Sequence, residues 1–156
     1  MKVLANDGIS QSGIDALQAK GFEVITTNVA QEQLISYINE NKVTVLLVRS
    51  ATTARKDLVD SCPSLKIIGR GGVGMDNIDV DYAREKGLKV INTPASSSAS
   101  VAELVFAHLY GGVRFLHDSN RNMPLEGESN FKGLKKAYAK GIELRGKTIG
   151  IIGFGR

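Results

Sequence analysis

The sequence is short of several residue types, and each shortage excludes a class of protein. It has one cysteine, Cys62, in 156 residues, so it cannot form an internal disulfide and is no disulfide-stabilised scaffold. It has no tryptophan, and its clustered basic residues are interleaved with one aromatic residue, Tyr138, whereas a nucleic-acid-binding face needs aromatic platforms. No apolar run approaches the roughly 18 residues of a membrane-spanning helix, and residues 1–8 lack the apolar stretch of a signal peptide. We therefore expect a cytoplasmic protein that binds neither nucleic acid nor membrane.

What remains is the composition of an ordinary globular chain with an uneven charge. Hydrophobic residues make up 42% and charged residues 23%, and the length allows a hydrophobic core. The net charge of +4 is concentrated in residues 132–147, which carry six basic side chains against one acidic side chain, Glu143. Tyr138 is the one aromatic residue among them, so we interpret the segment as a solvated surface.

Short β-branched runs alternate with helical patterns through the first 95 residues. Five strands are predicted, at residues 3–5, 22–25, 43–48, 65–68 and 88–91. The helices between them include one that Ser10 caps and Gly21 ends, and one over residues 56–61. Because parallel strands need crossover connections and helices supply them, the pattern predicts an α/β fold with a doubly wound parallel sheet.

The pattern changes after Pro94. Apolar residues at three- and four-residue spacings predict a helix reaching about His117, with Ser100 and Glu103 as its capping box. Residues 118–145 are polar and contain glycine, and we interpret them as a long connection.

Residues 147–152 read as a sixth strand that runs into Gly153-Phe154-Gly155. A strand followed by Gly-x-Gly is the opening of a dinucleotide-binding fingerprint. If the polypeptide ends at Arg156, we expect oligomerisation or disorder in residues 118–156, since an exposed apolar edge strand invites pairing.

A glycine-rich loop at residues 69–74 is the first candidate binding site. Ligands of doubly wound sheets bind at the carboxyl ends of strands, and this loop follows the fourth strand. Its glycines can turn several backbone N–H groups toward one anion, and Arg70 adds a planar set of five donors. Arg49 leaves the neighbouring strand at an equivalent place. The loop therefore predicts a small anionic ligand; the alternative is a tight turn with Arg70 in a surface ion pair.

Five segments in the same order together resemble one family, the D-isomer-specific 2-hydroxyacid dehydrogenases. The family implies an oxidoreductase that transfers hydride between NAD and a D-2-hydroxy or 2-oxo acid, in a homo-dimer or higher oligomer. Within the family, the sequence is most similar to the members of serine biosynthesis that convert 3-phosphoglycerate to 3-phosphohydroxypyruvate. One departure is Ser97, where the family often has asparagine. The five segments are residues 48–52, 69–79, 90–94, 100–104 and 144–156.

The resemblance also implies two domains and a set of binding residues. Residues 1–95 would form a flavodoxin-like substrate-binding domain. Residues 96–156 would form a linker, a crossing helix, and the first strand and glycine turn of a truncated Rossmann NAD-binding domain. The residues that it places on the substrate side are Arg49, Ser50, Ala51, Arg70, Gly71, Gly72, Val73 and Gly74. Those that it places on NAD are Val73, Gly153, Phe154, Gly155 and Arg156.

We predict no catalytic residue and no metal site in this sequence. The family carries its catalytic arginine, glutamate and histidine downstream of the fingerprint, so this fragment alone is expected to be inactive. His108 and His117 precede the fingerprint and are expected to pack or to lie on a dimer surface. Cys62 has no histidine in its motif, so a role as nucleophile is not expected.

Three alternatives compete with the dehydrogenase. A phospho-receiver module needs an aspartate after the third strand, where this sequence has Arg49-Ser50. A flavodoxin-type carrier needs a Ser/Thr-rich phosphate loop after the first strand, where this sequence has Asn6-Asp7-Gly8. A non-catalytic small-anion-binding or dimerisation domain stays as the alternative if the protein ends at Arg156.

Overall fold

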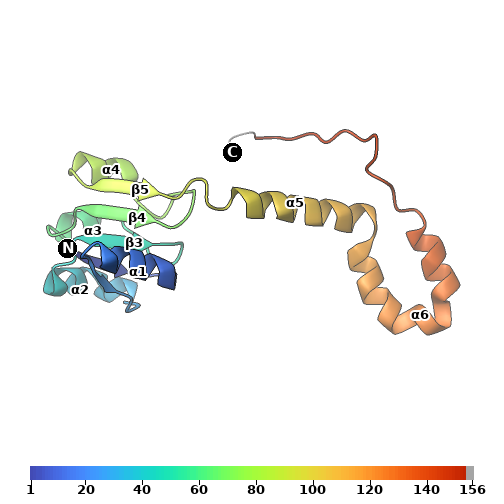
Figure 1. Ribbon diagram of the computed structural model, residues 1–156, viewed down its shortest axis with the longest axis horizontal. Helices are drawn as coiled ribbons and strands as arrows, with labels where there is room; N and C mark the ends of the chain where they lie inside the picture. The colour runs from blue at the N-terminus through green and yellow to red at the C-terminus, as the bar shows by residue number, and fades with distance from the viewer. Residues whose placement is uncertain (154–156) are drawn as a thin grey trace. The chain divides into compact units, whose positions relative to one another are not determined.

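A computed structural model describes residues 1–153 of the chain, in two compact units (Figure 1). The first unit is Met1–Ser96, and the second begins at Ser97. Phe154, Gly155 and Arg156, three of the candidate NAD-binding residues, lie outside the described part.

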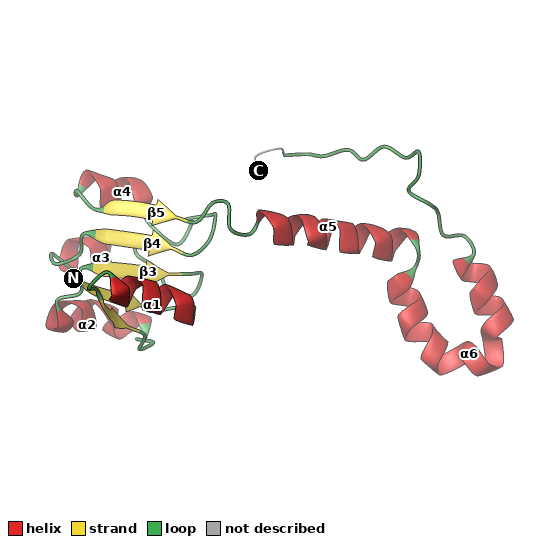
Figure 2. Cartoon of the chain, in the orientation of Figure 1, coloured by secondary structure: helices red, strands yellow, loops and turns green. Residues whose placement is uncertain are grey.

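The first unit contains a five-stranded parallel sheet, which confirms the predicted fold class (Figure 2). The strand order is β2-β1-β3-β4-β5, the order of flavodoxin-like doubly wound folds. Every neighbouring pair is parallel, so the carboxyl ends of all five strands reach the same edge of the sheet. The strands are β1 (Lys2–Ala5), β2 (Glu23–Ile25), β3 (Val45–Val48), β4 (Ile67–Arg70) and β5 (Lys89–Asn92).

Helices supply the crossovers between these strands, as the alternating pattern predicts. Ser10 caps α1, since its hydroxyl accepts a hydrogen bond from the Gly13 N–H at 3.3 Å, and Gly21 follows the helix with φ +80°. The helices are α1 (Gln11–Ala19), α2 (Leu34–Asn41) after a short 3₁₀ turn η1 (Gln31–Gln33), α3 (Lys56–Ser61) and α4 (Val80–Glu85).

The core lies on both sides of the central strands. Leu46 in β3 and Ile68 in β4 are fully buried, as are Leu34 and Ile38 of α2 and Leu58 of α3. Burying each such side chain contributes about 1.5–3 kcal/mol. These central strands are therefore firmly held, and the loops at their carboxyl ends start from fixed positions.

The second unit differs from the expectation for it. The helix α5 (Ser98–Val113) begins before Ser100 and has no side-chain cap, so the predicted capping box is wrong. It ends at Val113, because Phe115 adopts a left-handed conformation with φ +53°. A second helix, α6 (Leu116–Tyr138), then occupies most of the predicted polar connection, with a kink at Asn130. Leucine, glutamate and lysine favour a helix over residues 125–136, although Pro124, Gly127 and Gly133 oppose it.

Residues 147–152 form no strand, and the predicted sixth strand is wrong for the described structure. Strand residues exchange backbone hydrogen bonds with a neighbouring strand. Lys147 instead donates to the Leu144 carbonyl of its own turn, and no strand pairs with this segment in the described residues.

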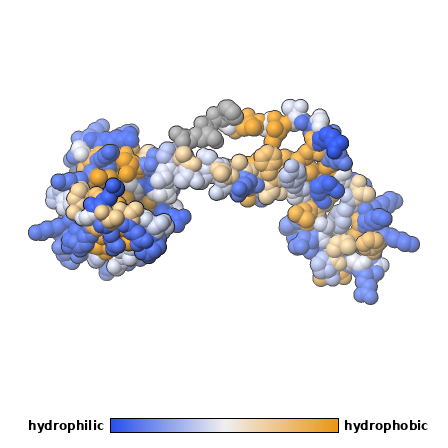
Figure 3. All heavy atoms as spheres, in the orientation of Figure 1, coloured by the Kyte–Doolittle hydropathy of each residue, from blue (hydrophilic) through white to orange (hydrophobic). Residues whose placement is uncertain are grey.

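Many large apolar side chains of the second unit are exposed, and Figure 3 shows apolar atoms on its surface. Within α5, Val101, Leu104 and Phe106 are each more than half exposed. Leu134 of α6 is the one buried hydrophobic side chain among the residues described there. None of the helices in residues 1–153 combines the length and the apolar character needed to span a bilayer.

Candidate functional site

A cavity of about 710 Å³ lies at the carboxyl edge of the sheet, within the first unit. This volume is in the range of small-molecule sites. The loop after β1 and the ends of β3, β4 and β5 all contribute to its wall. Its lining residues are Asp7, Gly8, Ile9, Ser10, Leu47, Val48, Arg49, Gly69, Arg70, Gly71, Ile91, Asn92 and Thr93.

The turn that follows β3 is held by the side chain of Asp7. One carboxylate oxygen accepts hydrogen bonds from the Arg49 N–H at 2.6 Å and the Thr52 N–H at 3.1 Å, and the other accepts from the Thr52 hydroxyl. Burial alone would raise the pKa of Asp7, but these hydrogen bonds to the charged form outweigh it and hold the pKa below its usual value. Asp7 is therefore a charged anchor of the turn.

Arg70, at the end of β4, bends over the glycine loop. Its Nε donates to the Arg49 carbonyl at 3.1 Å, and its Nη1 donates to the Gly74 carbonyl. A side chain at position 72 would place its Cβ 2.9 Å from that Nη1, so Gly72 gives the guanidinium room. None of the loop glycines has a positive φ, so the backbone conformation alone does not require glycine. Gly72 serves instead to leave space for the Arg70 side chain.

The alternative interpretation of Arg70 was a surface ion pair, and the structure does not form one. Within the described residues, neither Arg70 nor Arg49 lies within ion-pair distance of a carboxylate. Two guanidinium groups without a paired carboxylate therefore stand at adjacent strand ends, and β3 and β4 are neighbours in the sheet. Such groups suit a carboxylate or phosphate ligand.

The glycine loop itself has fewer available donors than the sequence suggested. The N–H of Gly71 donates to the Val48 carbonyl, and the N–H of Gly72 donates to the Arg70 carbonyl. From β5, the Asn92 amide donates to the Val73 carbonyl at 2.7 Å. The loop is thus fixed from two sides, and an anion bound there would depend more on the arginines than on a ring of N–H groups.

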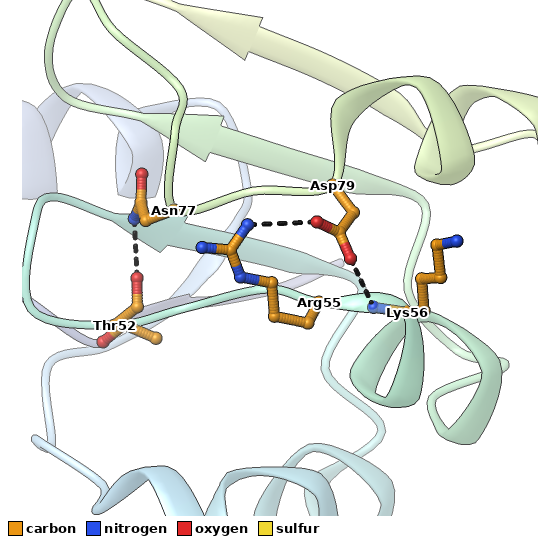
Figure 4. Close-up of polar contacts among 5 residues, drawn as sticks. All are labelled: Thr52, Arg55, Lys56, Asn77 and Asp79. Carbon is orange, nitrogen blue, oxygen red and sulfur yellow. Dashed lines mark hydrogen bonds and ion pairs between the residues drawn. The ribbon is translucent and has the colours of Figure 1, made fainter.

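A second set of contacts, made by Asn77 and Asp79, holds residues 52–56 in place (Figure 4). The Asn77 amide donates to the carbonyls of Arg49 at 2.8 Å and Thr52 at 2.6 Å. Asp79 accepts from the Lys56 N–H at the start of α3 and pairs with Arg55, both at 3.0 Å. A carboxylate at a helix N-terminus is stabilising, and here it also ties the start of α3 to the residue directly before α4.

The cavity brings together some of the predicted substrate residues. Arg49, Arg70 and Gly71 line it. The other five are in the same two loops but not in its wall: Ser50, Ala51, Gly72, Val73 and Gly74. Val73 is 52% exposed.

Asp7, Thr52 and Asn77 are site residues that sequence reasoning misses. The position of Asp7 just after the first strand is the one indication that the sequence offers. The side-chain hydrogen bonds that these three make join residues 25 to 46 positions apart in the sequence, which no local pattern reveals.

Cys62 and His117 carry reactive groups but are not among the residues that line the cavity. Cys62 is buried, and burial raises the pKa of its thiol to about 11, so the thiolate is scarce. The His117 ring lies 3.6 Å from the Asp118 carboxylate, and both are mostly exposed. No cluster of metal-ligating side chains occurs in residues 1–153. Gly153 has φ +88°, which suits a tight glycine turn, but the strand expected before it is not formed.

A match to a protein-family model shows which family the chain belongs to. The family model of the D-isomer specific 2-hydroxyacid dehydrogenase, catalytic domain, matches residues 3–144. The chain belongs to this family. The segments that carry the resemblance, including the glycine loop, lie largely within the matched range.

Characterised relatives are similar over the whole chain. A D-3-phosphoglycerate dehydrogenase of Methanocaldococcus jannaschii is 39% identical over 156 residues, which are 100% of this chain and 28% of that protein. A hydroxypyruvate reductase of Thermotoga maritima is 41% identical over 155 residues, which are 99% of this chain and 48% of that protein. The chain therefore spans between about a quarter and a half of the length of these relatives.

Solved structures with a similar fold include a D-mandelate dehydrogenase of Rhodotorula graminis, with a TM-score of 0.74 and 19% identity over 91% of this chain and 45% of that one. An NAD⁺-bound 3-phosphoglycerate dehydrogenase of Entamoeba histolytica has a TM-score of 0.60 and 27% identity over 73% of this chain and 39% of that one. The fold of the family thus agrees with the parallel sheet described above.

Proposed function

We propose that the chain provides the substrate-binding part of an NAD-dependent dehydrogenase that oxidises a phosphorylated D-2-hydroxy acid, 3-phosphoglycerate, to 3-phosphohydroxypyruvate in serine biosynthesis. The observation that carries the proposal is the cavity with Arg49 and Arg70 at adjacent strand ends, neither of them paired with a carboxylate in the described residues. An acid with a carboxylate and a phosphate offers two anionic groups to these two arginines.

Family membership supports the reaction class, and the relatives support the substrate and the cofactor. The relative from Methanocaldococcus jannaschii is named for 3-phosphoglycerate, and the Entamoeba histolytica structure holds NAD⁺. The proposal assigns Val73 and Gly153 to Arg156 to NAD, residues 96–156 to the start of its domain, and a homo-dimer or higher oligomer to the assembly. The free, buried thiol of Cys62 agrees with a reducing cytoplasm.

Hydride transfer needs an acid/base group that the proposal places outside residues 1–156. The 156-residue chain alone should therefore show no turnover with NAD and 3-phosphoglycerate. The function is tested in a hybrid, in which the chain replaces the matching segment of the Methanocaldococcus jannaschii enzyme. A folded hybrid should reduce NAD with 3-phosphoglycerate, and a folded hybrid without turnover contradicts the proposal.

Within that hybrid, Arg70→Ala should raise the KM for 3-phosphoglycerate more than the KM for NAD. Arg84→Ala, which removes the same charge from the exposed surface of α4, is the matched control and should leave both unchanged. An unchanged KM for 3-phosphoglycerate in Arg70→Ala would remove Arg70 from the substrate site.

The Thermotoga maritima relative is named for an unphosphorylated acid, and this favours one alternative substrate class. D-glycerate has the skeleton of 3-phosphoglycerate without the phosphate. If the hybrid used D-glycerate as efficiently as 3-phosphoglycerate, the phosphate assignment would be wrong and an unphosphorylated hydroxy acid would take its place.

A further inference from the structure

Asp7 is an unexpected residue for the wall of an anion site. Its carboxylate lines the same cavity as Arg49 and Arg70, and a negative charge there repels an anionic ligand. Its lowered pKa keeps it charged near neutral pH, so protonation does not relieve the repulsion. Such a residue needs a compensating role.

The hydrogen bonds of Asp7 identify that role. Both of its oxygens are used by the turn after β3, through the N–H groups of Arg49 and Thr52 and the Thr52 hydroxyl. These groups direct their positive ends at the carboxylate, so they offset much of its negative charge. The buried Asn6 amide also donates to the Thr52 hydroxyl at 2.8 Å, which fixes that hydroxyl as a donor toward Asp7.

The Arg49 carbonyl, on the other side of the turn, is held by two hydrogen-bond donors. The Arg49 carbonyl accepts from the Asn77 amide at 2.8 Å and from the Nε of Arg70 at 3.1 Å. The Arg49 peptide units are thus fixed by an acceptor on one side and by donors on the other. Because Arg70 uses the Arg49 carbonyl as an anchor, a shift of the turn displaces both guanidinium groups.

We propose that Asp7 is a positioning residue of the anion site, which fixes the turn of Arg49 and, through the Arg49 carbonyl, the guanidinium of Arg70. Its effect on binding rests on the proposed function, whereas its effect on the turn does not. The proposal goes beyond the arginines themselves, since Asp7 acts on the ligand only through them.

The substitution Asp7→Asn separates positioning from simple electrostatics by the sign of the effect. Removing a negative charge from the cavity would by itself tighten the binding of an anion. Asparagine keeps one acceptor oxygen for the N–H groups of Arg49 and Thr52, but its Nδ2 would face the Thr52 hydroxyl as a second donor beside the Asn6 amide. The hydrogen bond from that hydroxyl would be lost, and the turn would loosen. Positioning therefore predicts that 3-phosphoglycerate binds about tenfold more weakly to Asp7→Asn, the equivalent of one lost hydrogen bond to a charged group.

Asp76→Asn is the matched control, because it removes the same charge from an exposed residue just after the glycine loop, whereas the hydrogen bonds to the turn come from Asp7. It should bind 3-phosphoglycerate as tightly as the original chain or more tightly. Binding is measured by calorimetric titration of the 156-residue chain at pH 7. Equal or tighter binding by Asp7→Asn overturns the proposal.

Amide hydrogen exchange measures how often the turn opens, and the measurement needs no ligand. In Asp7→Asn, the amides of Arg49 and Thr52 should exchange at least about tenfold faster, while those of Leu46 and Ile68 in the core stay unchanged. Unchanged exchange at Arg49 and Thr52 also overturns the proposal. If the original chain does not bind 3-phosphoglycerate, the proposed function fails, and the exchange result still decides the role of Asp7.

Thr52→Val provides a second variant in case Asp7→Asn does not fold. It keeps the carboxylate and the shape of the buried side chain but removes one of the three donors to Asp7. Faster exchange at the Arg49 amide supports the proposal, and an unaltered Arg49 amide contradicts it.

Discussion

The side chain of Asn6 links the end of β1 to two loops at the edge of the sheet that holds the site. It is 3% exposed and follows β1 directly. Its Oδ1 accepts from the Val29 N–H at 2.8 Å, and its Nδ2 donates to the Val29 carbonyl at 3.0 Å. The same Nδ2 donates to the Thr52 hydroxyl. One side chain therefore connects the loop before α2 to the turn after β3.

The substitution Asn6→Ala removes all three hydrogen bonds and leaves the backbone of Val29, a residue only 7% exposed, without its partners. Each buried polar group left unsatisfied costs about 1–3 kcal/mol, so two of them give a loss of about 2–6 kcal/mol in the free energy of unfolding. Because domains of this kind have about 5–15 kcal/mol in total, the variant should be severely destabilised.

Urea denaturation followed by far-UV circular dichroism measures the loss. The matched control is Asn39→Ala, which removes a single exposed hydrogen bond to the Ser61 carbonyl and should cost less than about 1 kcal/mol. If Asn6→Ala loses no more than the Asn39 control, the buried network is not what holds the edge of the sheet.

Three further predictions concern the site and the core. Gly72→Ala should weaken the binding of 3-phosphoglycerate with little loss of stability, because the new Cβ meets the movable end of Arg70; unaltered binding in calorimetry would contradict this. Since the folded pKa of Asp7 lies below its ordinary 3.8, its stabilising effect should be present above that pH and lost as the pH falls through the folded value. Acid titrations of stability should thus be flatter for Asp7→Asn, and identical slopes would refute the account. Cys62, with a pKa of about 11, should react with a thiol reagent only on unfolding, as absorbance assays would show.

The first unit could be predicted well because its signals are local. Buried parallel strands read as continuous apolar runs, and Val45–Val48 is such a run. The cap at Ser10 and the stop at Gly21 follow from single residues with known preferences. The sequence also placed Arg49 and Arg70 at neighbouring strand ends, because strand order in this topology determines which ends meet.

The second unit and the finer structure of the site could not be predicted in the same way. The polar pattern of residues 118–138 hides a helix, since Pro124 and two glycines argue against one and a single buried residue, Leu134, marks its packed side. The apolar run at 147–152 indicated a strand, but an apolar run alone does not supply a neighbour to pair with. The use of Asp7 by the turn after β3 depends on a contact between residues 45 positions apart.

The most direct test of the central claim is a ¹⁵N-resolved NMR titration of the 156-residue chain with 3-phosphoglycerate at neutral pH. We expect saturable shifts at the amides of Arg49, Arg70 and Asn92, which surround the cavity. D-glycerate should cause smaller shifts at higher concentration. If the shifts fall instead on the basic residues 132–147, or if the cavity amides do not respond, this edge of the sheet is not the anion site.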